Sequence, residues 1–393
     1  MTHAILVKVT ACVTIHPNTF KKAMIRKRRQ KILLFLTLLG LLLTPTLLQS
    51  QGLTKNAHFD NRNLPKGCAS CHIGHGMYNT PMLPEQKDKL CFNCHGYSDN
   101  REKMKRNGYV AKDVTLNNLD REFEKPYHHP IEKIRIHQYG ETLPEIDQSI
   151  PRHSECGDCH HHHYVKKGNS TIGIKGVNSQ GAKIESIISG YELCFKCHSN
   201  SANLPPDQTN KAEIFSVSNP SYHPVIAPGK NADVPSLILS LTPSSTIKCT
   251  DCHNNNDRTG PKGPHGSEYK HILSRNFNQT GGPEGAFEYE LCYHCHNRNS
   301  ILSNRSFPYH RLHLSTVGAS CRTCHNPHGS MKYSHLIDFD NISIRPTSSG
   351  RLEFNDFGTR TGQCYLQCHG KDHNPASYPG QIGTPSTSSK PKK

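Results

Sequence analysis

The chain has 393 residues, with 47 lysines and arginines against 31 acidic residues and no tryptophan. With 7% aromatic residues and a mean hydropathy of −0.66, its side chains supply too little apolar area for a conventional core of this size. Eight of the basic residues and none of the acidic ones lie in the first 50 positions. The charge excess of the remainder is therefore modest, and it does not indicate nucleic-acid binding.

Residues 1–50 have the pattern of a secretory signal peptide. Seven basic residues between Lys21 and Lys31 precede an almost wholly apolar run from Ile32 to Leu48, and Met24 is an alternative start. A run of about 17 apolar residues lies at the lower limit for spanning a bilayer, so an uncleaved anchor with membrane association is the alternative. We expect an exported protein, located in the periplasm or at the outer surface of the cell.

Sixteen of the 17 cysteines form eight pairs, and a histidine follows the second cysteine of every pair. Two thiols about one turn apart can add to the vinyl groups of one haem, and the next imidazole then becomes the proximal ligand. Zinc ribbons and disulfides also use paired cysteines, but neither requires the histidine. The eight groups are Cys68, Cys71 and His72; Cys91, Cys94 and His95; Cys156, Cys159 and His160; Cys194, Cys197 and His198; Cys249, Cys252 and His253; Cys292, Cys295 and His296; Cys321, Cys324 and His325; and Cys364, Cys368 and His369. The pattern predicts eight covalently attached haem c groups.

The eighth motif departs from the others because three residues, not two, separate Cys364 from Cys368. Longer spacers occur in c-type cytochromes, so we keep this motif as a haem site. The alternative is a disulfide between these cysteines, which would reduce the haem count to seven.

The motifs alternate between two types along the chain. Odd-numbered motifs have small or polar spacers, whereas even-numbered ones place an aromatic residue directly after the first cysteine: Phe92, Phe195, Tyr293 and Tyr365. We therefore predict four two-haem units, at 55–126 (with a connector), 127–220, 221–305 and 306–375, followed by a mobile tail at 376–393. The predicted fold is irregular, mostly coil with short α-helices, and built around a haem-packed core.

Two further sets of histidines recur with the units. One leader histidine precedes each unit, and one trailing histidine follows the first motif of each unit. The trailing histidine usually comes three residues after the motif histidine. His265 comes twelve residues after it, within a Pro-His-Gly-Ser stretch that also occurs at 327–330. We expect these to be the distal iron ligands, two for each unit, because the methionines have no recurring placement. The leaders are His58, His129, His223 and His310; the trailing histidines are His75, His163, His265 and His328.

Several of these assignments have neighbouring alternatives. The competitors are His161 and His162 for His163, His128 for His129, His271 for His265, and His313 for His310, with His137, His153, His294, His335 and His373 as further candidates. The segments Tyr191–Cys194 and Tyr289–Cys292 predict short helices that lead into attachment sites. Residues 99–150 read as a charged connector without a strong period.

The doubled motif with its His-Pro leader, and the stretch Cys-His-Asn-Pro-His-Gly at 324–329, resemble the doubled-CxxCH multihaem cytochromes, including those exported by metal-reducing bacteria. The resemblance covers about residues 55–375. It implies neighbouring porphyrins in near contact and electrons that hop between irons, in respiration to periplasmic or extracellular acceptors. Other redox proteins are then the expected partners, and nucleic acid is not.

Two alternatives to a monomeric electron carrier remain. One is an octahaem oxidoreductase of the nitrite, hydroxylamine or tetrathionate type, which needs one haem with an open distal side. The chain has no CxxCK motif and no shortage of histidine. We therefore favour the carrier and assign no catalytic residue. The other is a homo-oligomer or filament, in which an imidazole of one copy ligates a haem of the next.

Overall fold

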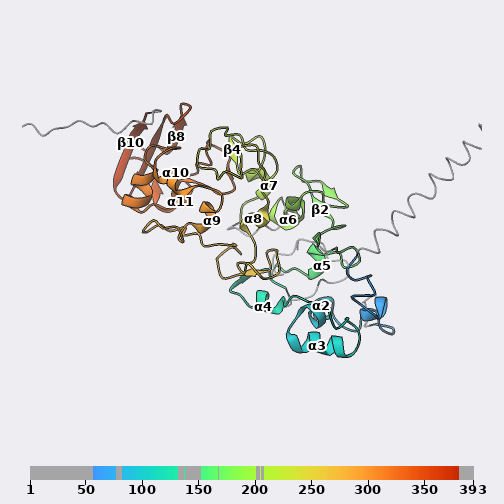
Figure 1. Ribbon diagram of the computed structural model, residues 1–393. Helices are drawn as coiled ribbons and strands as arrows, with labels where there is room; N and C mark the ends of the chain where they lie inside the picture. The colour runs from blue at the N-terminus through green and yellow to red at the C-terminus, as the bar shows by residue number, and fades with distance from the viewer. Residues whose placement is uncertain are drawn as a thin grey trace, which may run out of the picture.

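The computed structural model describes residues 56–76, 82–131, 137, 152–166, 168–200, 204 and 208–379. The expected signal peptide and residues 380–393 of the expected tail lie outside these ranges. Figure 1 shows an elongated molecule, with the α2 and α3 region at one end and the strands β8 and β10 at the other. Within the described ranges no helix is both long and apolar enough to cross a bilayer.

The helices are short, and most of them carry an attachment motif. The expected helices at the fourth and sixth motifs are confirmed as α6 (Gly190–His198) and α9 (Glu290–Tyr293). The other motif-bearing helices are η1 (Gly67–Ser70), α2 (Lys87–His95), α5 (Cys156–Cys159), α8 (Cys249–Cys252) and α11 (Cys321–Cys324). The remaining helices are α3 (Ser98–Arg106), α4 (Asp120–Phe123), α7 (Lys211–Ile214), α10 (Arg298–Leu302) and the π-helical turn η2 (Leu312–Val317). The expected connector at 99–150 thus includes most of α3 and all of α4, so its first part is helical.

The polar spacers of the odd-numbered motifs have a structural reason. In α5 the backbone N–H of Glu155 donates to Asp158 Oδ2 over 2.7 Å, and in α8 the N–H of Lys248 donates to Asp251 Oδ2 over 2.8 Å. Such a bond satisfies a backbone donor that the start of a helix leaves without a partner. The spacer residue therefore fixes the single turn on which both cysteines lie.

Small antiparallel ladders join units that are far apart in the sequence. Strand β1 (Tyr127–His128) pairs with β5 (Gly266–Ser267), and β4 (Ser221–Tyr222) pairs with β6 (Gly329–Ser330). In the first unit an isolated bridge between Asn56 and Lys166 occupies the comparable place. A hairpin of β2 (Gly176–Val177) and β3 (Lys183–Ile184) completes this set. The β1–β5 and β4–β6 ladders each hold a leader segment of one unit against the trailing-histidine region of the next, whereas the β2–β3 hairpin lies within the second unit.

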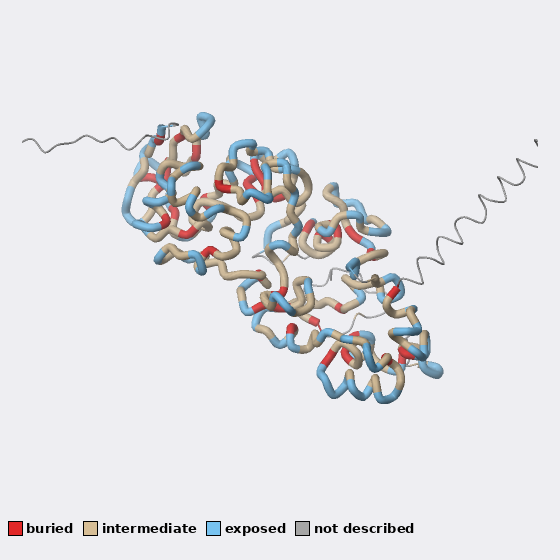
Figure 2. The backbone as a smooth tube through the Cα atoms, viewed as in Figure 1, coloured by how far each residue is buried: buried red, intermediate tan, exposed pale blue. Residues whose placement is uncertain are grey.

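The C-terminal region differs from the rest because it has a four-stranded sheet with its own apolar core. Strand β9 (Gly362–Cys368) pairs with β7 (Ile344–Arg345), β8 (Glu353–Asp356) and β10 (Lys371–Tyr378). Phe339, Phe354 and Leu366 are buried together there. Because β10 continues to Tyr378, ordered structure extends into the first residues of the expected tail. A second, smaller cluster joins Phe195, Phe215 and Tyr222, and the other buried residues lie in short stretches along the chain (Figure 2). The fold is thus mostly coil with short helices and small sheets, as the sequence predicts.

Candidate haem-binding sites

Attachment turns present two thiols and one imidazole on a single turn of backbone. The N–H of His160 donates to the carbonyl of Cys156 over 2.9 Å, and His253 and His325 make the same bond to Cys249 and Cys321, at 2.8 Å and 3.0 Å. Each bond closes one helical turn from the first cysteine to the histidine. The three groups that a c-type haem needs are therefore held together at each of these motifs.

At seven of the eight motifs a predicted distal histidine faces the motif histidine. The ring centres of each pair lie 6.0–6.5 Å apart. The pairs are His72 with His163, His95 with His58, His160 with His265, His198 with His129, His253 with His328, His296 with His223, and His325 with His310.

This separation fits one iron between two imidazoles. Metal–imidazole bonds of about 2.0–2.1 Å, with about 1.1 Å from each nitrogen to its ring centre, place two axial rings about 6.3 Å apart. Direct ring stacking would bring the centres closer than this. The donor sets therefore suit a haem iron.

Six of the seven pairs, those of the first three units, follow a regular offset; in the fourth unit His310 instead faces His325, the first motif of its own unit. Leader histidines face the second motif of their own unit, as His129 faces His198. Trailing histidines face the first motif of the preceding unit, as His265 faces His160. The expectation that each unit supplies both of its own distal histidines is therefore wrong for the trailing set, because the inter-unit ladders carry these residues across to their neighbours.

Hydrogen bonds at Nδ1 orient the leader histidines. His58 Nδ1 lies 3.0 Å from the carbonyl oxygen of His162, His129 Nδ1 lies 2.7 Å from that of Pro264, and His223 Nδ1 bonds that of Pro327. Each of these carbonyls immediately precedes the trailing histidine of the next unit. An Nδ1–H that donates to a carbonyl leaves Nε2 as the free lone pair for a metal.

Two of the odd-numbered motif histidines, His253 and His325, are oriented in the same way by residues that the sequence offered as alternative distal ligands. His253 Nδ1 lies 2.8 Å from the carbonyl oxygen of His271, and His325 Nδ1 lies 2.9 Å from that of His335. Both residues that supply the accepting carbonyl, His271 and His335, have positive φ, 65° and 57°. His271 and His335 were candidates for distal ligands, but it is their backbone that contacts the site. The matching His-Ile-Leu and His-Leu-Ile stretches at 271–273 and 335–337 were the available sequence signal.

Burial keeps many of these imidazoles neutral. Desolvation lowers the pKa of His95, His198 and His296 to about 4, and that of the trailing histidine His328 to about 3. A neutral imidazole is the form that binds a metal.

The attachment thiols follow one another in sequence order. Between units, helix α2 contacts α5 and helix α6 contacts α8, so that Cys91 lies near Cys156 and Cys194 near Cys249, and each pair shifts the pKa of its members, as Cys292 and Cys321 also do. Within the third unit, burial raises the pKa of Cys252 to about 12, and the nearby Cys292 and Cys295 contribute to the same shift. In the fourth, the pKa of Cys324 is raised to about 12 by burial and by the proximity of Cys364 and Cys368.

The eighth motif has a different backbone from the other seven. Cys364 and Cys368 lie on one face of strand β9, and His369 occupies the turn to β10 with a φ of 47°. Four residues of strand span about 13 Å, which is too long for a disulfide between the two cysteines and also departs from the one-turn spacing that holds both thiols at the helical motifs. Among the described residues no imidazole faces His369 in the way seen at the other motifs. His75, a predicted distal ligand, is exposed and faces none of the motif histidines.

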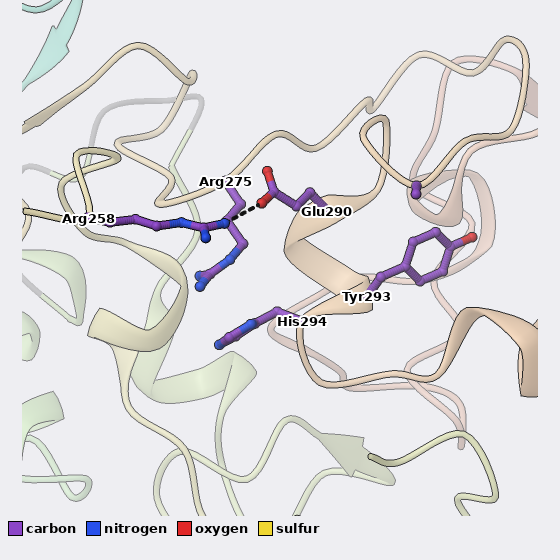
Figure 3. A pocket seen from close by; sticks show the side chains of 6 residues that line it. Arg258, Arg275, Glu290, Tyr293 and His294 are labelled. Carbon is purple, nitrogen blue, oxygen red and sulfur yellow. Dashed lines mark hydrogen bonds and ion pairs between the residues drawn. The ribbon is translucent and has the colours of Figure 1, made fainter.

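A cavity of about 360 Å³ lies beside the sixth motif. Figure 3 shows Arg258, Arg275 and His294 around it, with Tyr293 turned to the other side. Arg258 is paired with Glu290 at 3.1 Å, and desolvation followed by the charge of Arg275 lowers the pKa of His294. The lining is thus cationic next to an attachment turn.

Comparison with known proteins gives one family. The model of the doubled CXXCH motif matches residues 62–100 and 242–300, which contain the first and third pairs of motifs. Neither the curated proteins nor the solved structures give a significant match. The matched motifs support a multihaem c-type cytochrome and indicate covalently bound haem c.

Proposed function

We propose that this chain carries eight haem c groups in single file and works by electron transfer. The observation that supports this most strongly is the succession of motifs: seven motif histidines each face a second imidazole, and the second motif of a unit contacts the first motif of the next where helix α2 meets α5 and α6 meets α8. Contact at the attachment points brings neighbouring porphyrins close together, so an electron can pass along the chain in short steps. The fourth unit continues the series through Cys324 and its two neighbours, Cys364 and Cys368.

The paired histidines define what the irons can do. A haem iron with two imidazole ligands is six-coordinate and closed to substrate, and without an axial methionine its reduction potential is low. The Nδ1 bonds to backbone carbonyls hold these rings in place in either oxidation state, which keeps structural rearrangement on electron transfer small. The protein's contribution is therefore placement and orientation, and the redox chemistry is that of the haem.

The proposed setting is respiration in the periplasm or outside the cell, with other redox proteins or terminal acceptors as partners. The signal-like N-terminus supports export, and thioether attachment keeps haem from being lost by dissociation. Association with a membrane through residues 32–48, and assembly into oligomers or a filament, belong to this same proposal.

Haem content tests the proposal directly. Intact-protein mass and a pyridine haemochrome assay of the purified protein are expected to give eight haems per chain. Electron paramagnetic resonance is expected to show low-spin ferric signals for at least seven of them. A count of seven, with unmodified thiols at Cys364 and Cys368, would contradict the eighth site but leave the carrier function in place.

One observation favours a second candidate, the octahaem oxidoreductase. His369 has no facing imidazole among the described residues, so the eighth iron could offer an open side. Steady-state reduction of nitrite, hydroxylamine or tetrathionate by the isolated protein would support this candidate. Absence of turnover, with electrons still exchanged with soluble redox dyes, is the result expected for a carrier.

A further inference from the structure

Helix α7 lies between two successive haem-binding sites. It contacts helix α6, which carries the fourth attachment motif. Phe215, the residue after α7, is buried in one cluster with Phe195 of α6, and its ring lies edge to face with that of His328, 5.5 Å between centres. His328 in turn faces His253 of the fifth motif. The short helix α7 is therefore packed against the fourth site and against the distal side of the fifth.

Lys211 is the first residue of α7 and brings a positive charge to this place. Its Nζ lies 2.7 Å from Thr209 Oγ1 and 3.0 Å from the Thr209 carbonyl oxygen, both of which are neutral. Desolvation lowers the pKa of this half-buried ammonium, and no carboxylate of the described residues offsets that shift or forms an ion pair with Lys211. Glu213 lies two positions along the helix and therefore occupies its opposite side.

The charge of Lys211 acts on the ligands of two irons. Burial is the main cause of the lowered pKa values of His198, His253 and His328, and the positive charge of Lys211 lowers each of them further. The first is the motif histidine of the fourth site, and the other two are the facing imidazoles of the fifth. A half-buried ammonium beside two iron sites is unfavourable unless a negative group lies near it.

Two arginines repeat this arrangement at other sites. After burial and the charge of Lys211, Arg322 contributes to the lowered pKa of His328, and one of its guanidinium nitrogens is buried with no hydrogen-bond partner among the described residues. The charge of Arg101 contributes, after burial and two imidazoles, to the lowered pKa of His95, and its Nε is buried in the same way. Neither arginine forms an ion pair within the described part of the chain. Unpaired cations beside iron ligands indicate a common anion that is not a side chain.

Haem itself carries anions of the required kind. Each haem c has two propionate carboxylates, which take part neither in thioether attachment nor in axial ligation. A carboxylate is the partner that an ammonium group prefers in a partly buried place, because a charge-assisted hydrogen bond offsets the loss of solvation. Since α6 contacts α8, the fourth and fifth attachment helices are also neighbours. Lys211 therefore fits the propionates of these two haems.

We propose that Lys211 is the shared counter-ion of propionate groups of the fourth and fifth haems, where the second unit meets the third. The inference rests on the proposed haem chain and deepens it, because it assigns one residue that links two successive haems. Reduction of a haem adds one negative charge, so a nearby ammonium stabilises the ferrous form. Lys211 thus raises the reduction potentials of both haems at a step where an electron passes from one unit to the next.

Two other roles for Lys211 give different results on substitution. A purely structural lysine would act through its hydrogen bonds to Thr209, which the side-chain amide of a glutamine can also donate. A lysine that acts on the irons only through space would change their potentials and leave the propionates as they are. Lys211→Gln and Lys211→Arg together distinguish these roles, since the first removes the charge and the second keeps it.

The test compares haem-loaded wild type, Lys211→Gln, Lys211→Arg and, as the matched control, Lys175→Gln. Lys175 precedes strand β2, which also contacts α6, but its side chain is 72% exposed and already paired with Glu185 at 2.7 Å. Potentiometric titration gives the haem potentials, and resonance Raman spectra give the propionate bending mode, which responds to hydrogen bonds at the carboxylates. Lys211→Gln is expected to lower the potentials of two haems and to shift the propionate mode. Lys211→Arg and Lys175→Gln are expected to match wild type.

Unchanged potentials in Lys211→Gln would overturn the proposal, as would an equal shift in Lys211→Arg or in Lys175→Gln. Lower potentials with an unchanged propionate mode would overturn the propionate contact. A structure of the haem-loaded wild type in which Lys211 Nζ is beyond hydrogen-bond distance of every propionate oxygen would overturn it without any variant.

Mass mapping of haem-bearing peptides separates this failure from failure of the proposed function. Any of these results with haem on the fourth and fifth motifs overturns the role of Lys211 and leaves the electron carrier in place. Free thiols at these two motifs in the wild type would overturn both.

Discussion

The imidazole of His129 donates through Nδ1 to the carbonyl oxygen of Pro264, 2.7 Å away, and so joins the second unit to the third. The same ring faces His198, with 6.4 Å between the ring centres. The Nδ1 bond thus orients the His129 ring, itself a predicted iron ligand. The same bond holds the residue that precedes the trailing histidine His265.

His129→Ala is expected to leave the fourth haem without its distal ligand. Because one iron then becomes five-coordinate or binds water, electron paramagnetic resonance should show one high-spin haem among the low-spin ones. His128→Ala is the control, since the His128 ring is not opposite His198. A high-spin signal in the His128 variant alone would show that the adjacent histidine is the ligand.

Gly266→Ala is expected to destabilise the contact of strand β5 with helix α4 and strand β1. A Cβ at this position would clash with the backbone carbonyl of Glu122 in α4, so backbone must move. Overpacking of this kind costs about 1–3 kcal/mol of unfolding free energy. Gly157→Ala, whose Cβ would meet no atom within 4 Å and which lies in helix α5, should be neutral or stabilising by up to about 1 kcal/mol. Equal effects of the two substitutions in chemical denaturation would contradict the close ladder.

Asp251→Ala is expected to weaken the fifth attachment turn. It removes the acceptor of the Lys248 N–H, 2.8 Å away, and loss of such a helix-start bond costs about 1 kcal/mol. Thr at this position, as in the seventh motif, retains an acceptor and should restore most of the loss. Unfolding free energies of the two variants check this, and an Asp251→Thr protein as unstable as Asp251→Ala would argue against the bond.

The ion pair of Glu284 and Arg298 predicts a dependence of stability on pH. Arg298 first, and then the Tyr293 hydroxyl, lower the pKa of the buried Glu284 carboxylate below its ordinary value of 4.5. A lowered pKa in the folded state means that this carboxylate stabilises the fold fully above pH 4.5 and that its contribution is lost as the pH falls through the folded pKa. Glu284→Gln should therefore cost about 1–3 kcal/mol near pH 7 and less in acid. A cost that does not vary with pH would contradict the charge-based account.

Much of the chemistry could be predicted from the sequence because covalent attachment depends on local spacing. Cys249, Cys252 and His253 are neighbours in the chain, and so they are neighbours on one turn in the structure. Which distal histidine faces which motif depends on contacts such as β1 with β5, between residues more than a hundred positions apart. No local pattern gives that offset.

The C-terminal sheet was not predicted for a different reason. The segment Gly362–Cys368 was interpreted as an attachment motif, and the other motifs of this chain are helical turns. Its apolar residues instead pack with Phe339 and Phe354 into a core that does not depend on a haem. The backbone carbonyls of His271 and His335 were missed because a side-chain inventory does not show backbone acceptors.

An experimental structure of the haem-loaded protein tests the central claim most directly, because iron positions and axial ligands can be read together. The account predicts eight irons in sequence order along the molecule, with His58, His129 and His223 opposite the second motifs of their units and His163, His265 and His328 opposite the first motifs of the preceding units. Irons that are not in sequence order, or trailing histidines that ligate the haems of their own units, would contradict it.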